Sequence, residues 1–371
     1  MKTVVVGLSG GVDSAVAAAL LKEQGYKVIG LFMNNWEEDD EDDNCTATAD
    51  WEDVKRICGV LDIPYYSVNF SKQYMDRVFS YFLKEYAAGR TPNPDVLCNR
   101  EIKFGPFLEY ALSLGADYVA TGHYASIEHV DGVHYLVKAK DDNKDQTYFL
   151  NQLSQEQLAK VLFPLGYIEK SQVRDIARKY NLNVAEKKDS TGICFIGERK
   201  FREFLKNYLP AKKGKIVSDK GIELGEHDGV MFYTLGQRKG LNIGGQKGSS
   251  GRWFVLGKNV ETNTLIVSCG EADSLFSSGL IATDYNFIPV KPSTDEFECF
   301  AKFRHRQQDQ RVKVKVVDDE LHITFDIKQR AITPGQFVVL YGNINNDGSV
   351  SANENEKLYC LGGAVIDKVI F

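Results

Sequence analysis

The chain has 371 residues, of which 43% are apolar, and its formal net charge is −6. This length predicts two or three domains, each able to bury its own core. Because no run of about 18 apolar residues is present, we expect no membrane span. The strand-like start of the chain also leads us to expect no signal peptide.

The cysteines and one acidic run indicate the redox compartment and the origin of the net charge. Seven cysteines with no Cys-x-x-Cys pair argue against a secreted disulfide framework and against a zinc finger, so we expect a reducing cytoplasm. Glu37–Asp43 contains seven acidic residues, which account for more than the whole net charge. We interpret this run as a solvated loop, with a metal site as the alternative.

The first 125 residues alternate between strand and helix patterns. Strands are expected over Thr3–Gly7, Lys27–Phe32, Tyr65–Asn69 and Ala116–Thr121, and helices over Ser14–Gln24, Thr46–Leu61, Lys72–Ala87 and Phe104–Leu114. Such alternation predicts an α/β domain with a doubly wound parallel sheet. Ligands bind these sheets beyond the carboxyl ends of the strands, where Gly7–Ser14 and Thr121–Tyr124 are expected to meet.

The stretch Val4–Ser14, Val-Val-Val-Gly-Leu-Ser-Gly-Gly-Val-Asp-Ser, joins the first strand to the first helix. Its glycines permit positive φ, and the N–H groups that begin a helix bind anions. No lysine follows as in a Walker A motif, and the dinucleotide-binding glycine spacing is absent. The Ser-Gly-Gly-Val-Asp-Ser form resembles the PP-loop of ATP pyrophosphatases. Asp13 beside phosphate indicates a bridging Mg²⁺.

The remainder of the chain is less regular at first and then β-rich. Helices are expected over Lys170–Tyr180 and Glu198–Tyr208, and the second lies in a basic stretch that is either a solvated face or a footprint for the phosphate backbone of RNA. Short glycine-punctuated segments over 209–272 suggest a small β-rich domain. Alternation in Arg311–Val317 and Leu321–Phe325, with turns at Asp318-Asp319 and Pro334-Gly335, predicts a small antiparallel β-barrel.

Two cysteines lie in segments suited to reactivity. Cys98 ends Thr91-Pro92-Asn93-Pro94-Asp95-Val96-Leu97-Cys98-Asn99, which we expect to be a rigid, non-helical loop. Cys194 lies in the glycine-bounded segment Gly192–Gly197. A buried, unreactive thiol is the competing interpretation for each cysteine, and it is the one we favour for Cys58, Cys269, Cys299 and Cys360.

Seven motifs in order extend the resemblance over nearly the whole chain. They are Ser9–Ser14, the acidic stretch after Met33-Asn34-Asn35-Trp36, Thr91–Asn99, Ala120–Ala125, Lys144–Leu150, Gly192–Gly197 and Gly236–Gly240. Together they resemble the tRNA-specific 2-thiouridylases, which replace the 2-oxygen of the wobble uridine with sulfur in tRNAs for lysine, glutamate and glutamine. The resemblance implies adenylation of that oxygen by ATP, followed by sulfur transfer from a cysteine persulfide.

The resemblance also implies roles for individual residues. ATP is held by Gly7, Leu8, Ser9, Gly10, Gly11, Val12, Asp13, Ser14, Met33 and Gly122, and Asp13 reaches Mg²⁺ through phosphate. Cys98 is the nucleophile, Cys194 carries the persulfide, and the pair closes as a disulfide that a thiol reduces. Asn93, Pro94 and Asp95 face the target base. Contacts to tRNA come from His123, Lys144, Asp145, Gln146, Arg304, His305 and Gln336. The family more often has tyrosine where His305 stands.

The expected organisation is a catalytic domain over 1–200, a small central domain contacting tRNA over 201–275, and a barrel domain over 276–371. The sulfur donor is either a cysteine desulfurase or a relay protein. Two other functions stay open: another PP-loop enzyme, such as a 4-thiouridine synthetase or an amidotransferase-type synthetase, or a non-catalytic RNA-binding protein. Substituting serine for Cys98 or Cys194 distinguishes them, because a pure binder keeps its activity.

Overall fold

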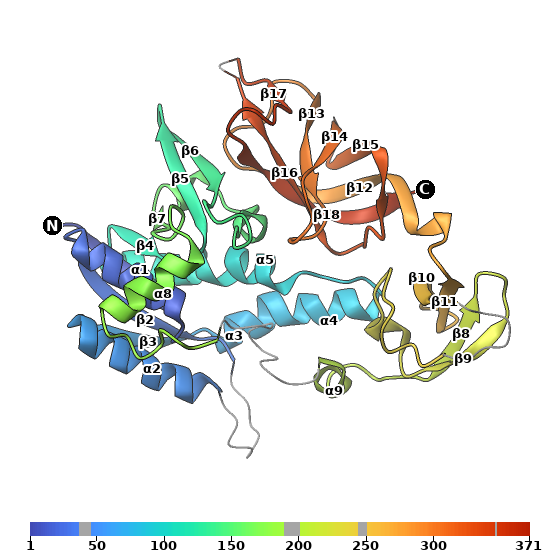
Figure 1. Ribbon diagram of the computed structural model, residues 1–371, viewed down its shortest axis with the longest axis horizontal. Helices are drawn as coiled ribbons and strands as arrows, with labels where there is room; N and C mark the ends of the chain where they lie inside the picture. Colours follow the sequence, from blue (N-terminus) through green and yellow to red (C-terminus); the bar gives the residue numbers. More distant parts are fainter. Residues whose placement is uncertain (37–45, 189–200, 244–250, 346) are drawn as a thin grey trace.

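The structure is a computed structural model and describes residues 1–36, 46–188, 201–243, 251–345 and 347–371. Within these residues the chain forms a five-stranded parallel sheet, a four-stranded middle sheet and a nine-stranded sheet that closes into a barrel (Figure 1). Helices α3 and α4 extend from the parallel sheet toward the middle sheet (Figure 1). The fold class expected from the sequence is confirmed.

The parallel sheet arises from the expected strand–helix alternation. Its strands are β1 (Thr3–Leu8), β2 (Lys27–Asn34), β3 (Tyr65–Asn69), β4 (Tyr118–Ala120) and β7 (Val161–Leu162). They lie in the order β3-β2-β1-β4-β7 and all neighbouring pairs are parallel. The direction of chain progression therefore reverses between β1 and β4, which is the position where open α/β sheets bind ligands. The short strand β7 is not predicted from the sequence.

Helices cover both faces of this sheet. Successive residues of β1 point to opposite faces, so Val4, Val6 and Leu8 enter one core while Val5 enters the other. The first core is covered by α1 (Val12–Glu23), α2 (Thr46–Leu61) and α8 (Lys170–Lys179). The second is covered by α3 (Ser71–Tyr74), the π-helical turn η1 (Met75–Phe79), α4 (Ser80–Ala87) and α6 (Pro106–Ser113).

Several helices differ from expectation in their ends or regularity; α1, for example, spans Val12–Glu23 where Ser14–Gln24 is expected. The helix expected over Lys72–Ala87 is one rod, α3–η1–α4, that contains a π-helical turn. The helix expected from Phe104 begins instead at Pro106, because proline favours the first helical position. Residues before it form the π-helical turn η2 (Asn99–Lys103), which follows α5 (Pro94–Cys98) directly.

A hairpin that is not predicted from the sequence links the first part of the chain to the barrel. It consists of β5 (Ala125–Val130) and β6 (Val133–Lys138), joined by Asp131 and Gly132 at φ 50° and 82°. An Asp-Gly pair suits this turn because both positions need positive φ. Strand β6 pairs with β18 (Tyr359–Ile370), so the hairpin extends the barrel sheet. The short helices η3 (Thr147–Leu150) and α7 (Gln155–Leu158) come next in the chain.

The middle sheet contains β8 (Gly214–Ser218), β9 (Glu223–His227), β10 (Trp253–Asn259) and β11 (Thr264–Cys269), in the order β10-β11-β8-β9. A short helix, η4 (Val230–Phe232), lies between β9 and β10. The helix expected over Glu198–Tyr208 is present as α9 (Phe201–Lys206), and its expected first residues lie outside the described part of the chain. The β-rich character expected for this region is confirmed.

The barrel is antiparallel and has six strands. They are β12 (Phe276–Phe287), β13 (Glu296–Lys302), β14 (Gln310–Val317), β15 (Glu320–Arg330), β16 (Phe337–Ile344) and β18, with the short β17 (Val350–Ser351) paired to β16. Pairing of β16 with β18 and of β18 with β12 closes the barrel. The expected turns are present, with positive φ at Asp318 and Gly335.

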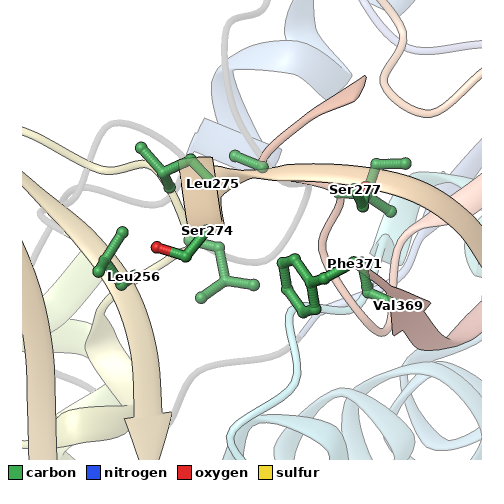
Figure 2. A pocket seen from close by; sticks show the side chains of 9 residues that line it. Leu256, Ser274, Leu275, Ser277, Val369 and Phe371 are labelled. Carbon is green, nitrogen blue, oxygen red and sulfur yellow. The ribbon is translucent and has the colours of Figure 1, made fainter. Parts of the chain in front are cut away.

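The middle sheet meets the barrel at a small, largely apolar recess. Its lining includes Leu256 from β10, Leu275 from the short helix η5 (Asp273–Leu275), Val369 from β18 and the last residue, Phe371. Figure 2 shows the Phe371 ring beside Val369, turned toward Ser274. The end of the chain therefore contributes to the junction between the second and third sheets.

Candidate functional site

The loop between β1 and α1 has the geometry of an anion site. Gly10 adopts φ +71°, and a Cβ on it would lie 2.6 Å from the Asp50 carbonyl oxygen, so only glycine fits here. Gly11 is the N-cap of α1 and supplies no capping side chain. The Ser9 N–H donates to Ser14 Oγ at 3.2 Å, which turns that hydroxyl toward the loop. The loop thus presents the positive end of α1 without a side-chain cap.

Other residues expected to hold ATP gather around this loop. A Cβ on Gly122 would lie 2.7 Å from the Ser14 backbone nitrogen, so the segment after β4 packs directly against the start of α1. Met33 lies near the carboxyl end of β2, the neighbour of β1, and is half-buried. The expected meeting of Gly7–Ser14 with Thr121–Tyr124 is confirmed. It occurs at the reversal point of the parallel sheet.

Asp13 is held by two groups from distant parts of the chain. Lys170 Nζ lies 2.6 and 2.8 Å from the two Asp13 carboxylate oxygens, and Tyr124 Oη donates to Oδ1 at 2.7 Å. Lys170 is the first residue of α8 and its side chain is mostly buried. A lysine therefore reaches the PP-loop, although none follows the glycines in sequence. Sequence reasoning misses it, because nothing in the local pattern around Lys170 indicates this contact.

Lys187 is a second lysine at the loop that sequence reasoning misses. Its Nζ donates to the Gly10 carbonyl oxygen at 3.0 Å and to the carboxylates of Asp50 and Asp53 at 2.8 and 2.7 Å. Burial opposes protonation of Lys187, but the hydrogen bonds to both aspartates outweigh it and raise its pKa. Lys187 therefore stays charged and joins the PP-loop to α2.

Cys98 lies at the end of a helix, and the expected non-helical loop over Thr91–Asn99 is wrong for its second half. Asn93 is the N-cap of α5, and its side chain accepts from the Asp95 and Val96 N–H groups at 3.2 and 3.3 Å. Pro94 takes the first helical position, where its fixed φ suits a helix. Asparagine followed by proline is thus a helix start here, a signal present in the sequence.

The Cys98 helix is packed into the core of the first part of the chain. Cys98 itself is 2% exposed. After the helix, the Asn99 side chain donates to the Phe149 carbonyl oxygen at 2.9 Å. Among the residues expected to face the target base, Asn93 and Pro94 are buried, and burial raises the pKa of Asp95 against the opposing charges of Lys103 and His305.

Three residues expected to contact tRNA have their polar groups engaged inside the protein. His123 is 9% exposed, its Nδ1 lies 2.7 Å from Thr121 Oγ1, and burial lowers its pKa well below 6.5. Asp145 is 3% exposed and accepts from the Ala139 N–H and the Thr147 hydroxyl. Gln146 Oε1 accepts from the Tyr124 N–H at 2.9 Å. Lys144, next to Asp145 in the chain, is half-buried.

The barrel residues expected to contact tRNA also bridge parts of the protein. His305 Nε2 lies 2.8 Å from the Asp145 carbonyl oxygen, and its ring centroid is 4.5 Å from that of Phe149. Arg304 donates to the Ala331 carbonyl oxygen at 2.6 Å. Gln336 Nε2 donates to the Thr91 carbonyl oxygen at 2.8 Å, immediately before α5. The structure brings His305 and Asp145 together, and it places Gln336 beside the Cys98 helix.

Cys194 and the rest of Gly192–Gly197 lie outside the described residues, as does the acidic run Glu37–Asp43. Of the other cysteines, Cys58, Cys299 and Cys360 are buried as expected, and burial raises the pKa of both Cys58 and Cys360 to about 12. Cys269 is exposed, contrary to expectation, because it is the last residue of β11. Because burial disfavours their thiolate forms, we assign Cys58, Cys299 and Cys360 structural roles.

The described residues contain no group of three or more His, Cys, Asp or Glu arranged to hold a metal ion. None of the helices within those residues is long and apolar enough to cross a membrane.

Comparison with known families reproduces this order of parts. The models that match are described as a tRNA methyl transferase HUP domain over residues 2–198, a tRNA methyl transferase PRC-barrel domain over 202–269 and an aminomethyltransferase beta-barrel domain over 277–366. The chain thus consists of a HUP domain followed by a PRC-barrel domain and a β-barrel domain.

Individual relatives define the family more narrowly. The tRNA-specific 2-thiouridylase MnmA of Oceanobacillus iheyensis is 58% identical over 370 residues, covering 99% of this chain and 95% of the relative. That of Alkaliphilus oremlandii is 57% identical over 369 residues, covering 99% and 97%. A solved 4-thiouridine synthetase–RNA complex with bound ATP is 16% identical, covers 56% of this chain and 49% of its own, and has a TM-score of 0.32. The chain belongs to the family of tRNA-specific 2-thiouridylases.

Proposed function

We propose that this protein is an ATP-dependent tRNA sulfurtransferase that makes 2-thiouridine at the wobble position of tRNAs for lysine, glutamate and glutamine. The observation that carries the proposal is the identity of 58% to a tRNA-specific 2-thiouridylase over nearly the whole chain. The uncapped PP-loop at the reversal point of the parallel sheet supports use of ATP. The reaction belongs in the cytoplasm, where thiols stay reduced.

ATP binds with its phosphates at the start of α1, on Gly7, Leu8, Ser9, Gly10, Gly11, Val12, Asp13 and Ser14, with Met33 and Gly122 beside them. Lys170, which contacts the Asp13 carboxylate beside the loop, would supply the positive charge that the loop itself lacks. Lys187 holds the Gly10 carbonyl in place.

Mg²⁺ fits this arrangement as a partner of phosphate. It is usually bound through one or two carboxylates together with phosphate oxygens, and the Asp13 carboxylate is about one-third exposed beside the loop. Asp13 would reach the ion through phosphate oxygens, and the ion when bound neutralises charge on the pyrophosphate leaving group.

The chemistry begins with attack of the uridine 2-oxygen on the α-phosphorus of ATP, which expels pyrophosphate and leaves AMP on that oxygen. A persulfide on Cys194 then attacks C2, and AMP departs with the bonding electrons. The Cys98 thiolate attacks the Cys194 sulfur, releases the thiolated base and forms the Cys98–Cys194 disulfide. If Cys98 instead attacks first, the freed hydrosulfide adds to C2, and the same disulfide results. A thiol reduces that disulfide.

The target base is extruded from the single-stranded anticodon loop toward Asn93, Pro94 and Asp95. We retain the division into 1–200, 201–275 and 276–371, since the four strands of the middle sheet and the six strands of the barrel each lie in one part, whereas the hairpin β5–β6 of the first part joins the barrel sheet. A cysteine desulfurase or a relay protein reloads Cys194. Of the tRNA residues expected in the first part of the chain, Lys144 and Gln146 are half-buried, whereas His123 and Asp145 are buried.

The test uses Cys98→Ser and Cys194→Ser with purified tRNA, ATP, Mg²⁺ and a persulfide source. Each variant is expected to bind tRNA with unchanged affinity and to make no 2-thiouridine. Cys299→Ser is the matched control, because that thiol is fully buried in the barrel. Normal thiolation by both catalytic-cysteine variants would disprove the mechanism.

A further inference from the structure

The segment that enters the Cys98 helix is attached to the barrel by backbone contacts. The Thr91 N–H donates to the Pro334 carbonyl oxygen at 2.9 Å, and Gln336 Nε2 donates to the Thr91 carbonyl oxygen at 2.8 Å. A Cβ on Gly335 would lie 2.9 Å from the Thr91 nitrogen. The turn Pro334–Gln336 between β15 and β16 is therefore in direct contact with the chain two residues before the helix cap.

Arg90 provides a second attachment one residue earlier. Its Nη1 donates to Asp367 Oδ1 at 2.8 Å, its Nη2 to the Ile366 carbonyl oxygen at 3.1 Å, and its Nε to Glu85 at 2.7 Å. Asp367 and Ile366 belong to β18, whereas Glu85 belongs to α4. One guanidinium thus joins the barrel, the long helix of the first part and the start of the Cys98 segment, with its side chain 22% exposed.

The two barrel anchors are themselves fixed to each other. The Gly335 N–H donates to the Ile366 carbonyl oxygen at 2.8 Å, and the Ile366 N–H donates to the Gln336 carbonyl oxygen at 2.8 Å. The turn and strand β18 therefore form one rigid surface. We call the four residues that connect it to the Cys98 segment, Arg90, Thr91, Gln336 and Asp367, the barrel tether.

The far end of the helix is also held. Arg100, two residues after Cys98, donates to Asp284 of β12 at 2.9 Å and to Gln152 Oε1 at 3.3 Å. Gln152 Nε2 in turn donates to the Gly363 carbonyl oxygen of β18 at 3.0 Å. Barrel contacts lie before the cap of α5, at Thr91, and after its last residue, at Arg100. Since α5 is only five residues long, these contacts hold both of its ends.

We propose that the barrel positions the reacting cysteine: the barrel tether and Arg100 hold both ends of α5, so that Cys98 keeps a set place relative to RNA bound by the barrel. This rests on the proposed function, in which Cys98 attacks sulfur. Gln336, Arg90 and Asp367 are positioning residues, since they act on α5 and do not touch the reacting atoms. Gln336 thereby has a role other than the tRNA contact expected from the family resemblance.

Positioning residues are expected to affect the rate of sulfur transfer and to leave the binding of tRNA and ATP unchanged. A displacement of about 1 Å in a reacting group costs on the order of 100-fold in rate, whereas binding of the substrates elsewhere is unaffected. Loss of the barrel tether should therefore lower the rate of sulfur transfer at saturating substrates by between about 10-fold and 100-fold. A role in tRNA contact would instead weaken tRNA binding.

The test compares wild type with Gln336→Met and Asp367→Asn. Gln336→Met keeps the side-chain length and removes the amide, and Asp367→Asn removes the charge facing Arg90. Glu298→Gln is the matched control, because Glu298 pairs with Arg311 on an exposed part of the same barrel, between β13 and β14. Persulfide-loaded protein is mixed with saturating ATP, Mg²⁺ and lysine tRNA transcript, and 2-thiouridine is followed in a single turnover well below each melting temperature.

The expected result is a rate at least 10-fold lower for both tether variants, with tRNA and ATP dissociation constants within about twofold of wild type and Glu298→Gln unchanged. Unaltered ATP affinity shows that the PP-loop part is folded. A wild-type rate in both variants overturns the proposal, as does weaker tRNA binding with an unchanged saturating rate. If wild type itself makes no 2-thiouridine, the proposed function fails, and this proposal fails with it.

Discussion

Lys187 offers the sharpest test of how the PP-loop is held. Replacing it by methionine keeps the length of the side chain and removes the ammonium group that contacts Gly10, Asp50 and Asp53. The Gly10 carbonyl then loses this donor, and the two carboxylates of α2 face each other without their shared cation. We expect the loop to lose the conformation that places Gly10 against the Asp50 backbone.

The magnitude depends on the contacts and their exposure. Hydrogen bonds that involve a charged group contribute about 1.5–3 kcal/mol when buried. Lys187 is 35% exposed and Asp53 also accepts from Asn183, so solvent screening and the second donor reduce the cost to about 1–2 kcal/mol of unfolding free energy. If most of this free energy is lost from the loop conformation that binds ATP, the affinity for ATP falls about 10-fold, since about 1.4 kcal/mol corresponds to a factor of ten.

The assay is calorimetric titration of a non-hydrolysable ATP analogue with Mg²⁺ into wild type and Lys187→Met, with thermal unfolding recorded in parallel. Lys179→Met is the matched control, because Lys179 pairs with Glu23 at 3.3 Å with both side chains more than half exposed. That variant should change neither quantity measurably. Analogue binding by Lys187→Met within twofold of wild type would refute the argument that this lysine shapes the loop.

Three further predictions address the PP-loop and the Cys98 helix. Lys170→Met removes the cation beside Asp13, so the rate of AMP formation with saturating ATP should fall at least 10-fold, measured with labelled ATP; an unchanged rate would mean that Lys170 is only a structural partner of Asp13. Gly10→Ala forces a methyl group to 2.6 Å from the Asp50 carbonyl oxygen at positive φ, and should abolish ATP binding and lower the melting temperature; normal binding would show that the loop relaxes freely. Burial raises the pKa of Asp95, so its ionised form costs stability once the pH rises through that raised value; Asp95→Asn should therefore melt higher than wild type at neutral pH, and the gain should disappear as the pH falls toward the ordinary value of 3.8. A gain that is constant with pH would contradict this cause.

The parallel sheet and the barrel were predictable from the sequence because each depends on a periodic pattern. Short apolar strands alternating with amphipathic helices are sufficient for the first, and period-two alternation with glycine and aspartate turns is sufficient for the second. The PP-loop was predictable because its glycines and serines are contiguous. These features are local, and local features are the ones that a single sequence displays.

The rest of the site depends on contacts between distant residues. Lys170 and Lys187 reach the PP-loop across 157 and 177 positions of the chain, and neither lies in a pattern that indicates its partner. The hairpin β5–β6 carried a readable Asp-Gly signal, but its pairing with β18 joins segments more than 200 residues apart. The burial of individual side chains could not be predicted from the sequence either. Asp145 and His123 were expected to contact tRNA, but their polar groups form hydrogen bonds inside the protein.

The α5 helix is an intermediate case. Its proline and asparagine residues suggest a loop when they are read as turn formers, and a helix start when they are read as a cap and a first helical residue. The two interpretations differ only in the conformation of the residues after Asp95. Val96, Leu97 and Cys98 are buried together on one short helix, so packing against the core decides in favour of the helix.

The most direct test of the central claim measures ATP and tRNA in one reaction. Purified protein is incubated with α-labelled ATP, Mg²⁺, a persulfide source and an unmodified lysine tRNA transcript, and AMP and 2-thiouridine are counted together. We predict one AMP for each 2-thiouridine, and neither product when the wobble uridine is replaced by cytidine. Formation of ADP, or of AMP that does not depend on the wobble uridine, would contradict the account.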